Sequence, residues 1–185
     1  MPAQNRSEVT TPWEIGTSVG GTVLHDILGD YWSSNYALGL DVLYPFHDRC
    51  PVILTGQVSF HNPNGDPLPR EGFHATDADL LLIHFTLMWN YYIINDRNVK
   101  PYAGLGLSTT TFFMSEEWPP EDYSDESEFG ASAVTGIQYE PNSLLRIFAD
   151  YHYNVVFSSP YILHFGTVRA GVRFALRKRG EKDEA

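Results

Sequence analysis

VKPYAGLGLSTTTFF, residues 99–113, is the stretch that decides the fold. In alternate steps, one face carries bulky apolar side chains such as Leu105, Leu107 and Phe113. The opposite face carries mostly glycines and hydroxyls, namely Tyr102, Gly104, Gly106, Ser108 and Thr110. A period of two predicts a β-strand. Because the polar face is also the small face, the strand suits a narrow wet interior on one side and lipid on the other.

The same contrast recurs in seven further segments, which predicts eight strands in all. The other segments are 13–24, 36–46, 52–61, 79–92, 128–139, 144–155 and 163–176. Strands of about ten residues, when tilted, are long enough to cross the hydrocarbon layer of a membrane. We therefore predict an all-β fold, an eight-stranded antiparallel up-and-down transmembrane β-barrel over residues 13–176. Residues 1–12 are interpreted as a flexible N-terminal segment and 177–185 as a charged C-terminal tail.

The connections between the predicted strands alternate in length. Long polar segments, 25–35, 62–78 and 114–127, follow the first, third and fifth strands, and short turns follow the second, fourth and sixth. Transmembrane barrels of the outer-membrane type have short turns on the periplasmic side and longer loops outside. With the N-terminus on the periplasmic side, all three short turns fall there.

The size of the apolar side chains decides which face of each strand points inward. An eight-stranded barrel has an interior only wide enough for side chains to fill. The apolar face holds Trp13, Tyr36, Phe46, Phe60, Phe85, Trp89, Tyr91, Phe113, Phe129, Tyr139, Tyr151 and Phe174. These residues cannot all fit inside, so we expect them to face lipid. A soluble, lipocalin-like ligand-binding barrel, with the opposite facing, is the alternative.

Composition excludes several classes of protein. The net charge of −11 argues against nucleic-acid binding, which requires clustered Lys and Arg. A single cysteine, Cys50, rules out an internal disulfide framework. The most apolar run, 80–89, is interrupted by His84 and is too short for a spanning helix. Residues 1–13 lack the pattern of a secretory signal, so we expect that any such signal is absent from this chain.

Charged and imidazole side chains occur on the predicted inner face. They are Glu14, Asp41, His84, Arg146, Asp150, His152, Arg169 and Arg173, with His61 nearby. Buried charges must be paired, and the signs nearly balance, so we hypothesise a salt-bridge network that fills the lumen. If the last strand closes against the first, Arg169 and Arg173 should lie between Asp150 and Glu14. An ion or proton path is the functional alternative.

The longest acidic segment lies within residues 114–127. Its carboxylates are Glu116, Glu117, Glu121, Asp122, Asp125 and Glu126. Such a run could hold Ca²⁺ or contact a basic partner, although acidic runs are usually solvated surface. The spacing of an EF-hand is absent, and we predict no metal site and no cofactor.

Three stretches resemble a known family. PYAGLGLS, FGASAVTGIQYEPNSLLRIFADYHY and FGTVRAGVRFAL are similar to the closing strands of the small, eight-stranded OmpA-like outer-membrane β-barrels. The matching positions are Tyr102, Gly104, Gly106, Gly136, Tyr139, Tyr151, Gly171 and Phe174. The family often ends on an aromatic residue, whereas here residues 175–185 follow Phe174. The resemblance implies location in the cell outer membrane, in contact with its lipid.

The predicted role is structural or one of surface interaction. A polar, plugged lumen would leave the external loops as contact sites, with loops 62–78 and 114–127 facing a protein partner. A small channel or carrier for hydrophobic molecules is the runner-up.

An enzyme would need a nucleophile beside a base. His152, Ser158, Ser159 and His164 lie near the end of the seventh strand. A lipid-modifying hydrolase of the small-barrel kind is expected to carry a His-x-Ser pair, which YHYNVV lacks. We therefore predict that the protein is not an enzyme and interpret His152 as a hydrogen-bonded lumen residue. Lipid hydrolysis stays as an alternative.

Overall fold

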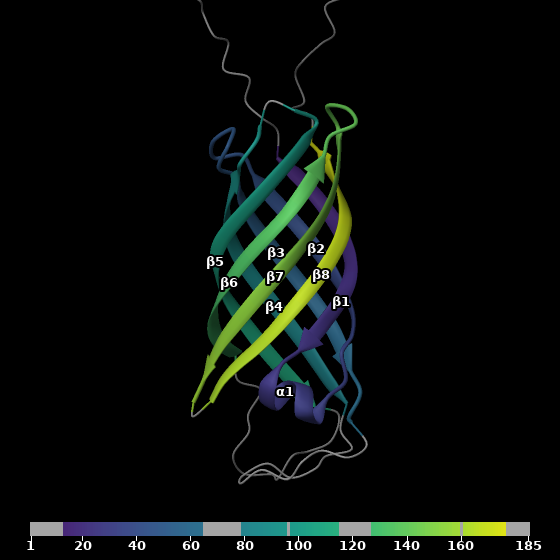
Figure 1. Cartoon of the computed structure of the whole chain (residues 1–185), viewed down its shortest axis with the longest axis vertical. Coiled ribbons are helices and arrows are strands. Elements are labelled where there is room, and N and C mark those ends of the chain that lie inside the picture. The colour runs from purple at the N-terminus through teal and green to yellow at the C-terminus, as the bar shows by residue number, and fades with distance from the viewer. Residues whose placement is uncertain (1–12, 65–78, 96, 115–126, 160, 177–185) are drawn as a thin grey trace, which may run out of the picture.

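The eight predicted strands form one closed barrel in the computed structural model (Figure 1). The strands are β1 (Glu14–Leu24), β2 (Asn35–Tyr44), β3 (Val52–His61), β4 (Leu80–Tyr92), β5 (Val99–Met114), β6 (Ser127–Tyr139), β7 (Leu145–Ser158) and β8 (Tyr161–Ala175). The structure describes residues 13–64, 79–95, 97–159 without 115–126, and 161–176. Each strand pairs with its neighbours in the chain, and every pairing is antiparallel. The predicted fold class is confirmed.

Closure joins the first strand to the last. β1 pairs with β8 over its whole length, from Glu14 opposite Ala175 to Leu24 opposite Phe165. The backbone N–H of Leu176 extends this ladder by donating to the carbonyl of Trp13 at 2.7 Å. Because the sheet closes on itself, β1 and β8 are paired to each other along this ladder and are not free edges there.

The two ends of the barrel differ. One end, here the turn end, carries the connections 45–51, 93–98 and 140–144 together with residues 13 and 176. The other, the loop end, is where β1, β3, β5 and β7 end, and it carries a short helix, α1 (Asp26–Tyr31) (Figure 1). Within the described part of the chain, no helix is long and apolar enough to cross a bilayer.

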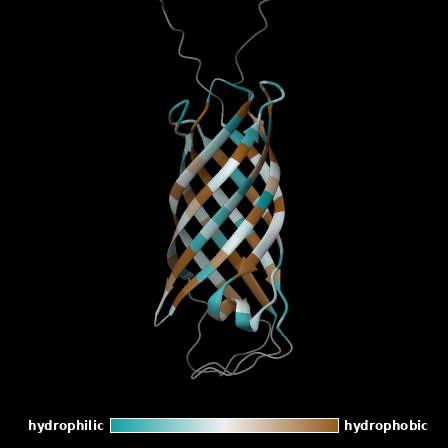
Figure 2. Cartoon of the chain, in the orientation of Figure 1, coloured by the Kyte–Doolittle hydropathy of each residue, from teal (hydrophilic) through white to brown (hydrophobic). Residues whose placement is uncertain are grey.

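Side chains alternate between the two faces of the wall, as the period of two requires. Leu105 and Leu107 are 72% and 73% exposed on the outside, whereas Thr110 on the same strand is fully buried inside. Apolar and polar positions accordingly alternate along the ribbons in Figure 2. The facing of β4, which has several apolar residues on both sides, also follows the prediction. This orientation rules out the soluble barrel.

Two local features differ from the expectation. Residues 25–35 were predicted as a polar loop but contain α1, which turns Leu28, Tyr31 and Trp32 into the barrel. In addition, β7 and β8 continue to Ser158 and Tyr161. They end in a short connection because residues 155–158 and 161–164 remain paired.

Candidate functional site

Two arginines from β8 form the centre of the lumen network. Arg169 donates to both oxygens of Asp150 on β7, with Nε–Oδ1 at 2.9 Å and Nη2–Oδ2 at 3.0 Å. Its Nη1 reaches Asp41 on β2 at 3.2 Å. Arg173 donates to Asp41 through Nε at 3.1 Å and Nη2 at 2.9 Å. Asp41 therefore bridges two guanidinium groups across the barrel.

Burial makes this pairing necessary. Asp41 is 0% exposed and Arg173 only 1%, and an unpaired charge in such a site costs several kcal/mol, as a rough figure. Thr55 adds a hydrogen bond to Asp41 at 2.9 Å. Arg173 also donates to Gln138 at 3.1 Å and lies 3.9 Å from the ring centroid of Phe148, a cation–π distance.

Glu14 does not pair with Arg169 or Arg173, contrary to the expectation, and pairs with Arg146 instead. Its carboxylate lies 3.4 Å from Arg146 at the turn end. Arg146 in turn contacts Glu140 at 3.0 Å, and Glu140 contacts Lys100 at 2.9 Å. The sequence could not show that Glu14 pairs with Arg146 and not with Arg169 or Arg173. Which residue faces which across a barrel depends on the stagger of its strands.

The three inward histidines have hydrogen-bond partners. His84 binds Thr110 through Nδ1 at 2.8 Å and Asn154 through Nε2 at 3.0 Å. His61 binds the Ser33 carbonyl at 2.9 Å and the Ser59 hydroxyl at 2.9 Å, near the loop end.

His152 belongs to the central network. Its Nε2 lies 2.8 Å from Nη2 of Arg169. Because a guanidinium can only donate, this nitrogen accepts and the other ring nitrogen carries the proton. The hydrogen bond of His152 thus goes to an arginine rather than to a serine, while Ser158 donates to Glu128 at 3.0 Å.

Apolar side chains fill much of the loop end of the lumen, which the sequence analysis missed. Leu28, Tyr31 and Trp32 of the α1 region pack against wall residues Leu24, Leu80, Leu82, Val156 and Phe165. We call this set the loop-end cluster. The spacing of positions 28, 31 and 32, at i, i+3 and i+4, is a helical pattern that could have indicated it. A turn-end cluster consists of Leu43, Ile53, Met88, Tyr92, Tyr102 and Val134.

Glycines on the inner face leave room for long side chains on neighbouring strands. A Cβ built on Gly171 would lie 2.7 Å from the ring of Phe148, and one on Gly136 would lie 2.8 Å from the ring of Tyr102. Both distances are below those that real Cβ atoms adopt. At these two positions the space beside the glycine is therefore occupied by a side chain that reaches across from the next strand.

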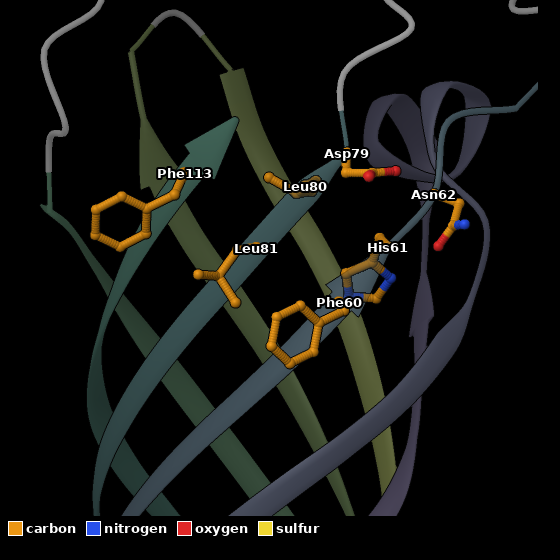
Figure 3. Close-up of a pocket in the computed structure, with 7 residues that line it drawn as sticks. All are labelled: Phe60, His61, Asn62, Asp79, Leu80, Leu81 and Phe113. Atoms are coloured by element: carbon orange, nitrogen blue, oxygen red, sulfur yellow. The ribbon is translucent and has the colours of Figure 1, made fainter. Parts of the chain in front are cut away.

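A surface pocket of about 330 Å³ opens at the rim of the loop end (Figure 3). Phe60, Leu81 and Phe113 are cross-strand neighbours on β3, β4 and β5 and form its apolar side. Asn62 and Asp79 border it on the polar side. The predicted contact loops continue from this rim, but residues 65–78 and 115–126, with all six acidic residues of the second loop, lie outside the described residues. Among the residues that the structure describes, no three His, Cys, Asp or Glu side chains gather as metal ligands would.

Comparison with known proteins identifies the group to which this barrel belongs. A family model described as the outer membrane protein beta-barrel domain matches residues 1–174. The chain belongs to this family. Outer membrane protein W of Salmonella typhi is 30% identical over 130 residues, which are 65% of this chain and 57% of that protein. The same protein of Salmonella typhimurium matches equally well. The chain thus spans little more than half the length of these curated relatives.

Solved structures agree on the fold. Neisserial surface protein A matches with a TM-score of 0.68 and 18% identity, over 89% of this chain and 97% of that chain. Ail, the attachment invasion locus protein of Yersinia pestis, matches with a TM-score of 0.54 and 17% identity, over 90% of this chain and 99% of that chain. The protein is thus a barrel of the outer membrane. The rule for such barrels predicts that its turn end is periplasmic and its loop end extracellular.

Proposed function

We propose that this outer-membrane barrel is closed to ions and serves as a rigid mount for its extracellular loops, which are the contact sites. The observation that supports closure is that side chains fill the lumen at three successive levels along its axis. The loop-end cluster comes first, the Asp41–Arg169–Asp150–Arg173 network second, and the turn-end cluster with the Glu14–Arg146 pair third. Eight strands leave little bore beyond such side chains.

Conductance in planar bilayers tests closure. The purified protein should give no steady, large current, because ions would have to displace both apolar clusters. A variant with Trp32→Ala and Leu28→Ala should remain without steady current, since the central network still blocks the path. Steady, large currents from the unaltered protein would contradict closure and favour the ion path.

The contact role is proposed for loops 62–78 and 114–127. The acidic residues between Glu116 and Glu126 supply six negative charges on one loop, which favours a basic protein partner. Fluorescence of Trp118 on that loop reports contact. Polylysine should change the emission at low salt and lose its effect as salt is added. Calcium alone, added in the same assay, distinguishes cation binding from contact with a polypeptide. If neither probe changes the emission, this loop is not the contact site.

Carriage of hydrophobic molecules is a second candidate, favoured by one observation. The loop-end cluster places Leu80, Leu82 and Phe165 inside the extracellular mouth, beneath α1. An alkyl chain could replace the side chains of α1 there. A fatty acid with a nitroxide label should then quench Trp32, and Leu82→Ser should weaken the quenching while Met88→Ser, in the turn-end cluster, should not. Equal quenching in both variants would reject this candidate.

We propose further that the protein has no lipid-hydrolysing activity. The hydrogen bond of His152 to Arg169 supports this, because a general base needs that nitrogen for its nucleophile. Hydrolysis of phospholipid or lipid A by the purified protein, abolished by His152→Ala, would overturn the proposal.

A further inference from the structure

Two histidines and a tyrosine meet on the outer face near the loop end. His164 on β8 lies with its Nδ1 3.0 Å from the hydroxyl of Tyr153 on β7, and the two rings stack with centroids 5.9 Å apart. His25, which follows β1, lies with its ring 6.4 Å from that of Tyr153. Its backbone N–H donates to the carbonyl of His164 at 3.1 Å. We call these three residues the His–Tyr cluster.

The cluster faces outward in the half of the barrel nearer the loop end. Tyr153 is 39% exposed, and its neighbours on the outer face of β7, Tyr151 and Phe157, are 38% and 55% exposed. Tyrosines that face outward near strand ends belong to the aromatic girdle, which lies among lipid head groups. The half-buried His25 and His164 are therefore placed where head groups meet the protein.

The cluster also presents unused donors. The Tyr153 hydroxyl can donate to Nδ1 of His164; in that arrangement His164 carries its proton on Nε2, where it can donate to a further group. Among the described residues, the imidazole of His25 has a ring contact with Tyr153 and no hydrogen bond. Two N–H donors on neighbouring elements are thus available to an acceptor that approaches from the lipid.

The described lysines and arginines lie away from the His–Tyr cluster. Of the lysines and arginines in the described part of the chain, Arg49, Arg97, Lys100 and Arg146 lie at the periplasmic end, and Arg169 and Arg173 lie inside the barrel. On the outer face near the extracellular end, as far as the structure describes it, the donors of the His–Tyr cluster face lipid phosphates without competition from Lys or Arg.

We propose that the His–Tyr cluster binds the phosphate of a membrane lipid in the outer leaflet. His25 and His164 donate to the phosphate oxygens, and Tyr153 is a positioning residue that holds the ring of His164. The apolar tail of the lipid then lies along Val23 and Val168, both exposed on the adjoining outer faces of β1 and β8. This inference is independent of whether the lumen conducts.

Imidazole ¹⁵N resonances test the site directly. The protein is placed in phosphatidylcholine nanodiscs that contain increasing amounts of phosphatidic acid, whose phosphate monoester is the probe. The resonances of His25 and His164 should shift together, while that of His47, on a periplasmic turn, should not. Shifts that are absent, or equal at all three residues, would overturn the proposal. The same shifts produced by inorganic phosphate alone would overturn the choice of a lipid as its source.

Variants measure the contribution of each group. His164→Phe and Tyr153→Phe should each weaken the binding of phosphatidic acid by roughly fivefold, the effect of losing one hydrogen bond. His47→Phe is the matched control and should leave it unchanged. Asp26→Asn removes a negative charge next to His25 in the chain and should strengthen binding. Circular dichroism verifies that each variant is folded, and unchanged affinity in folded His164→Phe would contradict the proposal.

Discussion

At the scale of single residues, Asp41 holds the lumen together because it accepts from two arginines at once. Replacing it by Asn keeps the shape but turns one acceptor oxygen into an amide donor and removes the negative charge that Arg169 and Arg173 share. We expect Asp41→Asn to lower the free energy of unfolding by about 3–5 kcal/mol, the usual cost of breaking a buried pair. Urea unfolding in lipid vesicles, followed by tryptophan fluorescence, measures this change.

The control for Asp41 lies on the surface. Asp48→Asn makes the same chemical change in an exposed turn and should leave the unfolding midpoint in place. Combining Asp41→Asn with Arg173→Met should cost less than the sum of the two single changes, because the pair is lost only once. Additive losses would show that the two side chains do not interact in solution.

Gly16 illustrates why the inner face is small. A Cβ at this position would lie 2.5 Å from Cγ of Arg173 and 2.5 Å from the carbonyl oxygen of Val172 on the neighbouring strand. Since one of these atoms is backbone, the strand itself must move. Gly16→Ala should therefore destabilise the barrel by about 1–3 kcal/mol in the same urea assay.

Gly21, on the same strand, is the matched control. Its added Cβ would meet nothing closer than 3.8 Å, so Gly21→Ala should be tolerated. If the two alanines have equal effects, the crowding at Gly16 is not what limits substitution.

The sequence could predict some of these pairs but not others. Asp150 and Arg169 are directly opposite on adjacent strands, so alternation and strand order place them together. Asp41 lies on β2, which is not a neighbour of β8 in the sheet. Its contacts with Arg169 and Arg173 cross the lumen and depend on the tilt and stagger of the closed barrel. Periodicity along one strand contains no information about these quantities.

At the scale of elements, α1 is the element that the polar sequence of residues 25–35 did not predict. Asp26, Gly29 and Asp30 make the segment polar, and six residues are too few for a helix to be stable alone. The helix depends on tertiary contacts. Among them, the side-chain amide of Asn64 donates to the carbonyls of Gly29 at 3.0 Å and Asp30 at 3.2 Å.

Asn64→Ala should release α1 without unfolding the barrel. We expect the amides of Gly29 and Trp32, which donate to His25 and Leu28, to exchange with solvent roughly 25-fold faster, as expected for the loss of two hydrogen bonds at about fivefold each. Hydrogen exchange measured by mass spectrometry gives the rate. Asn95→Ala removes a comparable amide-to-carbonyl bond, to Asp48, at the opposite end and should leave α1 unchanged. Unaltered exchange in Asn64→Ala would mean that the apolar contacts alone hold the helix.

The strands themselves were predictable because each has one buried and one lipid-facing side. Even β4, with Leu80, Leu82 and Met88 on its inner face, has the expected residues facing inward and outward. Its inward apolar residues fill the two clusters, so they reflect the contents of the lumen rather than a change of facing. The pattern could not predict whether apolar or polar side chains fill the lumen at a given level, because an inward and an outward leucine are the same residue in the sequence.

At the scale of the whole molecule, the inverted distribution of apolar residues places tryptophans in two different environments. Trp89 is 57% exposed on the outer wall near the periplasmic end, whereas Trp32 is 1% exposed inside the extracellular mouth. Lipids with brominated acyl chains quench tryptophans that they touch. In reconstituted vesicles, a variant with Trp89 as its single tryptophan should lose most of its emission, because its ring faces the acyl chains.

A variant with only Trp32 should keep its emission in the same lipids, since the barrel wall separates this ring from the bilayer. It should also be protected from acrylamide in water, because α1 covers it from the outside. Adding Asn64→Ala to this variant should increase quenching by acrylamide but not by brominated lipid, if α1 opens towards the solvent. Quenching of Trp32 by lipid in the unaltered background would show that the wall is open there, which would contradict the closed barrel.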